Sequence, residues 1–234
     1  MPQVTLEQRD GGVAVLTADR PPANAMDVTL LDELVAALDG VAADPPGALV
    51  LAGREGFFSA GADLKQVPTY GDAEQRRMVN AINDMALGVY DLPCPVVGAI
   101  TGHAIAGGLV LALCTDIRVA AREGRYGLTE VKVGVPYPQA AIGVVAAELT
   151  PHAARRLAFG NELLGADECL ALGVFDEVLD GDAVLGRALA IAAGLAAFPA
   201  DVYTRTKRDL RAATAARLRA AAAEDPLLAQ WVAG

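Results

Sequence analysis

Two short stretches of the sequence have the residue types needed to bind a polarised oxygen through backbone amides. Gly107 and Gly108 follow a predicted strand and loop and begin an apolar segment with helical character. The first amides of a helix have no acceptor within it and carry partial positive charge. In the second stretch, Gly61 permits a tight turn, and small Ala60 and Ala62 let a ligand approach the main chain. We expect the amides of Ala62 and Gly107 to bind one carbonyl oxygen, the arrangement of an oxyanion hole.

Such a site needs a group that moves protons, and Glu130 is the outstanding candidate. It lies in a mostly apolar, strand-like stretch between two turns. Burial there would raise the pKa of its carboxyl group and suit it to act as a general base. The alternative is a surface glutamate paired with Lys132 or an arginine, just as each glycine stretch alone is also compatible with a simple turn. Asp116, after the apolar segment, is interpreted as a structural carboxylate that accepts from backbone amides.

Composition narrows the possible partners of the site. The chain has 234 residues, of which 53% are hydrophobic and 21% charged, as in globular proteins, and its net charge is −10. The negative charge argues against nucleic acid, because phosphate binding needs a basic face. No run of eighteen apolar residues is uninterrupted, and the first residues match neither a signal peptide nor an anchor. We therefore expect a cytoplasmic protein that binds no membrane.

Several cofactor sites are not supported by the residues. There is no GxGxxG pattern and no P-loop, so a dinucleotide or nucleoside triphosphate site is not indicated. The three cysteines form no CxxC pair and the two histidines are far apart, so no metal site is expected and the thiols are read as free.

The residue pattern predicts an α/β core followed by helices. Alternating residues at 3–8 and 12–18 predict a hairpin, and Asp27 is a plausible N-cap for a helix over 27–41. Further strands are predicted at 48–53, 94–102 and 117–121, further helices at 72–91 and 106–116, a loop at 53–67, and a short strand plus loop at 125–138. From Gln139 to about Arg219 the pattern is almost wholly helical.

Taken together, three stretches resemble the crotonase superfamily, the enoyl-CoA hydratase/isomerase family. These are "FSAGADLK", "GHAIAGGLVLALCTDIRVA" and "YGLTEVKVGVP", with weaker matches at "RPPANAMD" and "ADECLALGVFDEVL". The resemblance covers about residues 4 to 215. It implies an α/β fold, a spiral of ββα units followed by a C-terminal helical trimerisation segment, and an assembly that is a homotrimer or a dimer of trimers.

The resemblance also implies a ligand and roles for residues. An acyl-CoA thioester would place its carbonyl oxygen on the amides of Ala62 and Gly107, with no separate cofactor because coenzyme A is part of the substrate. Ala60, Asp63 and Leu64 would line the adenine and pantetheine path, and Lys65 would lie near the CoA phosphates. Residues 1–137 would form the core with the thioester site. Residues 138–234 would serve oligomerisation and pocket cover, with a C-terminal helix that is shortened after Trp231.

Two departures from the family pattern favour one branch of it. Hydratases that resemble this chain carry a glutamate where Val110 stands, and tend to have glycine where Pro138 stands. A single glutamate, here Glu130, is what the Δ3,Δ2-enoyl-CoA isomerases of the family use, because a double-bond shift needs one base that removes and returns a proton. The alternatives are an enoyl-CoA hydratase, another CoA thioester reaction of this family, or a non-catalytic acyl-CoA binder.

Overall fold

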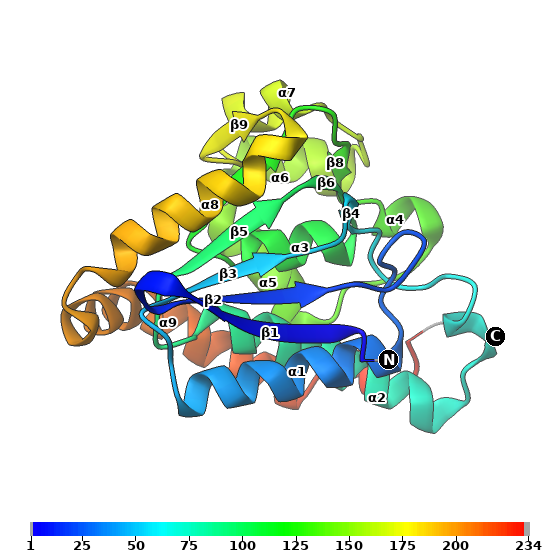
Figure 1. The fold of residues 1–234 in the computed structure, drawn as a ribbon. Helices are drawn as coiled ribbons and strands as arrows, with labels where there is room; N and C mark the ends of the chain where they lie inside the picture. Colours follow the sequence, from blue (N-terminus) through cyan, green and yellow to red (C-terminus); the bar gives the residue numbers. More distant parts are fainter. Residues whose placement is uncertain (1, 232–234) are drawn as a thin grey trace.

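The computed structural model describes residues 2–231 and shows an α/β architecture of two sheets and surrounding helices (Figure 1). The larger sheet has the order β1-β2-β3-β5-β7-β9 and the smaller one β4-β6-β8. Strands β1 and β2 pair antiparallel, and all other neighbours named here run parallel. The strands are β1 (Val4–Arg9), β2 (Val13–Ala18), β3 (Ala48–Ala52), β4 (Gly56–Ser59), β5 (Val96–Ile100), β6 (Gly102–Ile105), β7 (Ile117–Ala121), β8 (Tyr126–Gly127) and β9 (Glu177–Leu179).

Helices cover both faces of the larger sheet (Figure 1). Successive residues of a strand point to opposite faces, so Val13 and Val15 of β2 pack toward α8, while Ala14 and Leu16 face the main core. The helices are α1 (Val28–Ala43), α2 (Asp72–Tyr90), α3 (Gly107–Leu113), α4 (Glu130–Val133), α5 (Gln139–Glu148), α6 (Pro151–Ala154), α7 (Ala166–Ala171), α8 (Gly181–Ala196) and α9 (Ala200–Ala223). A π-helical turn at Arg155–Phe159 continues α6, and a 3-10 turn at Pro226–Leu228 follows α9.

The chain repeats one unit of two strands and a helix. In β3-β4-α2, β5-β6-α3 and β7-β8-α4, the first strand joins the larger sheet and the second joins the smaller one. The expected fold class, a spiral of ββα units followed by helices, is thereby confirmed. The proposed division at residue 137 stays a prediction.

Several expected elements are confirmed, and the errors concern short segments. Asp27 caps α1, since its Oδ1 accepts from the Leu30 amide at 2.8 Å. The loop expected at 53–67 contains β4, the strand expected at 94–102 is two strands, and β9 interrupts the region after Gln139 that was expected to be helical. Strands β4, β6 and β9 have three or four residues, too few to show a period of two, whereas β8 lies where a short strand was expected.

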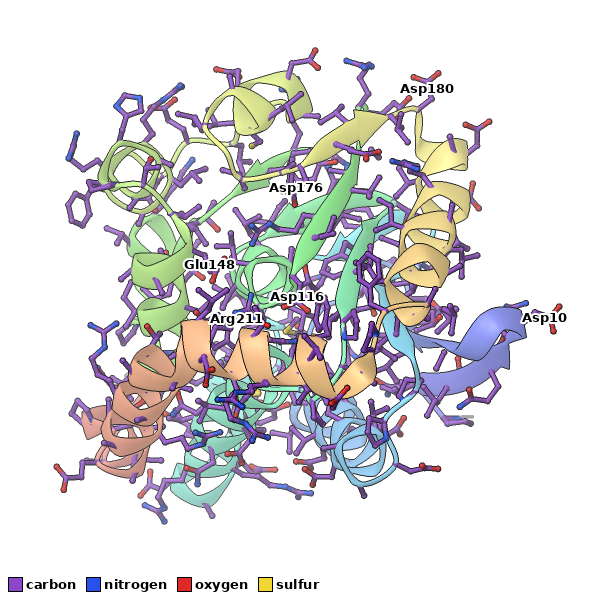
Figure 2. All side chains as sticks on the ribbon, turned by 90° about the vertical axis from the view of Figure 1, so that its left-hand side faces the viewer. Asp10, Asp116, Glu148, Asp176, Asp180 and Arg211 are labelled. Carbon is purple, nitrogen blue, oxygen red and sulfur yellow. The ribbon has the colours of Figure 1, made fainter. Side chains whose placement is uncertain are left out.

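A buried charge cluster holds α9 against the core (Figure 2). One Asp116 oxygen accepts from the Val96 amide at 2.8 Å and from Lys207 Nζ at 2.9 Å, and its other oxygen pairs with Arg211 at 2.8 Å. Arg211 also lies near Glu148, at 3.7 Å. The interpretation of Asp116 as a structural carboxylate is confirmed by these contacts.

Within the described residues, no single helix is both long and apolar enough to cross a membrane. Helix α8 together with residues 200–228 meets the length and composition test, but that pair is bent by 105°.

Candidate active site

Three loops that leave the smaller sheet converge on one site. Because β4, β6 and β8 are parallel, their carboxyl ends lie at the same edge. Ala62 follows β4, Gly107 follows β6 and Glu130 follows β8, each within three residues of the strand end. Ligands in parallel α/β folds bind at this edge of the sheet. The three residues that sequence analysis singled out are therefore brought together by the sheet that it missed.

The loop after β4 is fixed by a buried polar network. Asn24, in the left-handed region with φ 51°, donates through its side chain to the carbonyls of Ala18 at 2.8 Å and Phe58 at 2.7 Å. The Ser59 hydroxyl donates to the Asn24 carbonyl at 2.7 Å and accepts from the Gly61 amide at 3.1 Å. No role was expected for Asn24, although an asparagine shortly after two prolines is a signal for a left-handed turn residue.

The Ala62 amide points away from the neighbouring backbone segment at Met26. Met26 donates to the Gly61 carbonyl at 2.7 Å and accepts from the Asp63 amide at 2.8 Å, so Ala62 forms a parallel bridge whose own amide faces the other side. Gly61 has φ 78°, and a Cβ there would lie 2.9 Å from the Gly107 nitrogen. A Cβ on Gly107 would in turn lie 4.0 Å from the Ala62 nitrogen. The two amides thus lie in adjoining backbone segments that pack directly together.

Gly107 and Gly108 are glycines for different structural reasons, so alanine substitutions at the two positions should affect stability differently. A Cβ on Gly108 would lie 2.2 Å from the Ser59 carbonyl oxygen, so Gly108→Ala is expected to destabilise the fold by about 3 kcal/mol. A Cβ on Gly107 would have no neighbour closer than 3.6 Å, so Gly107→Ala is expected to leave stability unchanged or raise it by up to about 1 kcal/mol. Urea unfolding of both variants measures this, and equal losses would contradict it.

Glu130 is buried, as expected, but in a helical turn and not in a strand. It is the first residue of α4, and Gly134, with φ 73°, caps the carboxyl end of that helix. The short sequence Glu-Val-Lys-Val fits a strand or one helical turn equally, and the left-handed glycine decides for the turn. Glu130 is 7% exposed, and its Oε2 has no hydrogen-bond partner among the described residues. Burial raises the pKa of Glu130 from 4.5 to about 7, and the nearby Tyr137 hydroxyl and backbone amides oppose this only in part.

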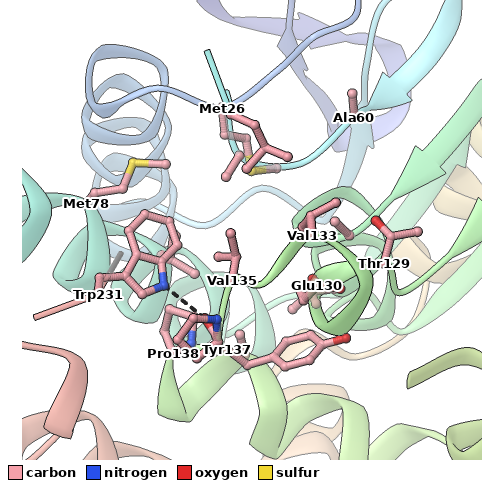
Figure 3. A pocket seen from close by; sticks show the side chains of 18 residues that line it. Met26, Ala60, Met78, Thr129, Glu130, Val133, Val135, Tyr137, Pro138 and Trp231 are labelled. Atoms are coloured by element: carbon pink, nitrogen blue, oxygen red, sulfur yellow. Dashed lines mark hydrogen bonds between the residues drawn. The ribbon is translucent and has the colours of Figure 1, made fainter. Parts of the chain in front are cut away.

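Glu130, Ala62 and Gly107 line one mostly apolar cavity, whose empty space is about 610 Å³ when the open solvent at its mouth is included (Figure 3). In the view of Figure 3, Trp231 and Met78 lie on one side, and Thr129 and Glu130 on the other. The remaining lining residues are Met26, Ala60, Ala62, Leu64, Ile82, Ala106, Gly107, Val110, Val133, Val135, Pro136, Tyr137, Pro138 and Ala141.

The four residues expected to bind CoA do not all face this cavity. Ala60 lines it, and Leu64 lines it while remaining 45% exposed at its mouth. The Asp63 carboxylate pairs with Arg20 at 2.9 Å and accepts from the Lys65 amide at 3.0 Å, so it fixes the loop and does not line the cavity. Lys65 is exposed beside Leu64, also outside the lining.

The far wall of the cavity depends on residues that sequence analysis missed. Trp231 is 4% exposed and donates from Nε1 to the Pro136 carbonyl at 2.8 Å. Asp225 accepts from the Asn83 side chain at 3.0 Å and from the Gln139 amide at 2.7 Å, while Asn83 accepts from the Ala140 amide. Asn83 and Asp225 are separated by 142 residues, and no local pattern shows that they meet. The tail after Trp231, for which a shortened helix was expected, lies outside the described residues.

Within residues 2–231, no group of three or more His, Cys, Asp or Glu side chains is placed to hold a metal ion. Among its described lining residues, the cavity has one carboxylate, whose pKa is raised, together with Ala62 and Gly107.

Comparisons with known proteins point to one family. The family described as "Enoyl-CoA hydratase/isomerase" matches residues 8–231. The chain is 35% identical over 183 residues to "Probable enoyl-CoA hydratase echA17" of Mycobacterium avium, which covers 78% of this chain and 71% of that protein. A crystal structure of an enoyl-CoA hydratase/isomerase family protein from Pseudomonas syringae superposes with a TM-score of 0.89 at 28% identity over 98% of both chains. The human mitochondrial delta3-delta2-enoyl-CoA isomerase gives 0.85 at 30% identity, over 94% of this chain and 87% of that one. A match along nearly the whole chain, to proteins of the same architecture, places it in the enoyl-CoA hydratase/isomerase family of CoA-thioester enzymes, the crotonase superfamily.

Proposed function

We propose that this chain moves the double bond of an enoyl-CoA thioester from Δ3 to Δ2, with Glu130 as the proton shuttle. One observation carries the proposal: of the eighteen described residues that line the cavity, Glu130 alone has a carboxylate. Val110, 1% exposed, fills the place where the resemblance puts the second glutamate of hydratases.

The proposed reaction needs only the groups at the site. The Glu130 carboxylate removes a proton from C2 of the 3-enoyl chain, and the electron pair spreads over a dienolate with negative charge on the thioester oxygen. The amides of Ala62 and Gly107 stabilise that charge. Glu130 then returns the proton to C4, which leaves the double bond between C2 and C3. A carboxyl group with a pKa of about 7 is suited to both steps at neutral pH.

The deciding experiment assays the protein with a 3-enoyl-CoA and, in parallel, with a 2-enoyl-CoA, because a hydratase adds water only to the conjugated double bond. Formation of conjugated 2-enoyl-CoA is followed by ultraviolet absorbance, and any 3-hydroxyacyl-CoA by mass. Conjugation without a hydroxy product supports the isomerase. A hydroxy product supports the hydratase alternative, which the name of the M. avium relative favours. Binding of acyl-CoA without either product supports the non-catalytic binder.

The raised pKa of Glu130 sets the expected pH dependence. A protonated carboxyl group cannot accept the C2 proton, so kcat/KM should fall as the pH drops through about 7, approaching a tenfold loss per pH unit. A pH–rate profile measures this midpoint. A profile that stays flat down to about pH 5 would mean that Glu130 keeps an ordinary carboxyl pKa or is not the base.

We also propose that the chain assembles as a homotrimer, or a dimer of trimers. The support is its resemblance to the family and a set of large apolar side chains on the surface, among them Val131, Phe159 and Leu210, which are 62%, 79% and 81% exposed. Light scattering after size-exclusion chromatography tests this against the chain mass of 24.0 kDa.

A further inference from the structure

Tyr137 is held rigidly beside Glu130 by the chain on both sides of it. After α4, the left-handed Gly134 turns the backbone so that the Val135 amide donates to the Glu130 carbonyl at 3.0 Å. The segment that follows is Pro136-Tyr137-Pro138, in which both prolines restrict the backbone. Trp231 anchors Pro136 through its Nε1, and the Pro138 carbonyl begins α5 by accepting from the Ile142 amide at 3.1 Å.

The Tyr137 hydroxyl and Glu130 Oε2 share a feature that is unusual for buried polar atoms. Each is buried, and neither has a hydrogen-bond partner among the described residues. Both side chains line the same cavity. A buried polar atom without a partner is costly, and two such atoms next to each other can satisfy one another after a small rotation of either side chain.

We propose that the Tyr137 hydroxyl positions the Glu130 carboxylate for proton transfer by donating a hydrogen bond to it. The hydroxyl donates while Glu130 is ionised. After Glu130 has taken the substrate proton, the hydroxyl oxygen can accept from the carboxylic acid, so the contact persists through the cycle. This role rests on the proposed isomerase function, in which one carboxylate must reach two carbons.

The electrostatics of the pair agree with this assignment. Burial and the neighbouring Glu130 raise the pKa of Tyr137 far above its ordinary value, so the hydroxyl keeps its proton and remains a donor. The same hydroxyl lowers the pKa of Glu130, against the larger effect of burial. Tyr137 is thus a positioning residue that also limits how far the pKa of the base rises.

The other charged groups near Glu130 have different partners. Lys132, on α4 itself, is exposed. Asp225, beside the start of α5, accepts from the Asn83 side chain and from the amides of Gln139 and Leu227. On α3 the facing residue is Val110, and from the tail it is Trp231, neither of which titrates. Tyr137 is the titratable side chain that acts on Glu130 among the described residues.

A direct titration of Glu130 tests the proposal without any turnover. The full-length protein is labelled with carboxyl-¹³C glutamate, and the Glu130 signal is identified by its loss in Glu130→Gln. Tyr137→Phe keeps the ring and removes the hydroxyl, and it should raise the Glu130 midpoint by about one pH unit. The matched control is Tyr70→Phe, because the Tyr70 hydroxyl donates to Gln66 at 3.1 Å and Tyr70 does not line the cavity. The Glu130 midpoint should not move in this variant.

The pH profile of activity gives a second readout that a purely structural role would not reproduce. In Tyr137→Phe, kcat/KM should fall about tenfold near pH 6 and recover to within about twofold of the unmodified protein near pH 9. If the phenylalanine variant does not fold, Tyr137→Leu repeats both measurements with a smaller side chain. An unchanged or lowered Glu130 midpoint overturns the proposal. A raised midpoint in a protein that does not isomerise 3-enoyl-CoA supports the contact and contradicts only the proposed function.

Discussion

Glu130→Gln is expected to lower kcat for double-bond migration by about 10³-fold, the usual loss when a general base is removed. Glutamine has nearly the same shape as glutamate, so the cavity should still bind acyl-CoA, and the dissociation constant should change little. The assay is the absorbance of conjugated 2-enoyl-CoA, with calorimetric titration of an acyl-CoA as the binding control.

The same variant should also be more stable than the unmodified protein at neutral pH. The pKa of Glu130 is raised on folding, so the folded state binds its proton more tightly than the unfolded state between about pH 4.5 and 7. Stability therefore falls as the pH rises through that window, by up to about 3 kcal/mol. Glutamine carries no such proton and should abolish this part of the pH dependence.

Urea unfolding at about pH 5 and about pH 8 separates the outcomes. A variant that loses activity and gains stability near pH 8 is expected, as at sites where function is maintained at the cost of stability. If the variant keeps its activity, the general base must be another residue. A variant that loses stability equally at both pH values would mean that the Glu130 carboxylate is held by the fold and is not poised for the ligand.

The candidate site residues were easier to predict than the scaffold that brings them together. Gly107, Ala62 and Glu130 were identifiable because small residues at a turn and a carboxylate among apolar neighbours are local signals. The hairpin and α2 were likewise visible, since their periods extend over many residues. The smaller sheet was not, because strands such as Gly56–Ser59 are too short to show a pattern and are stabilised by their neighbours in space.

Residues that act over long sequence separations were invisible for a related reason. Asn83 and Asp225 are ordinary polar residues until the fold brings them to the same helix end. Asp63 has a similar dependence, because its carboxylate pairs with Arg20, while its expected place along the CoA path stays a prediction. In both cases the partner determines the role, and the partner is set by tertiary structure.

Asp116→Ala is expected to be the most destabilising single substitution in the buried cluster under α9, with a loss of about 3–5 kcal/mol. Lys207 is 8% exposed, and its pKa is lowered by burial while Asp116 opposes that shift. Without the carboxylate, Lys207 would keep only the Cys94 carbonyl, at 3.0 Å, as a partner. Arg211 would retain Glu148 and its position 4.0 Å above the Tyr90 ring.

A double-mutant cycle, with stability measured by urea unfolding, isolates the interaction energy between Asp116 and Lys207. Adding Lys207→Met to Asp116→Ala should recover part of the lost stability, because it removes the uncompensated buried charge. The matched control is Asp209→Ala on the same helix, whose pair with Arg205 is 84% and 69% exposed and should change stability by less than about 0.5 kcal/mol. Equal losses for Asp116→Ala and Asp209→Ala would contradict the cluster's role.

This cluster should also matter to the cavity, which it does not touch. Helix α9 ends at Ala223, and the chain then supplies Asp225, which caps α5, and Trp231, which forms the cavity wall and anchors Pro136. A loosened α9 would release both supports at once. Near pH 9, where Glu130 is ionised, Asp116→Ala should therefore raise KM for the acyl-CoA more than it lowers kcat, whereas Glu130→Gln should do the reverse. The two variants together separate the residue proposed to move the proton from the helix expected to support the wall of the cavity.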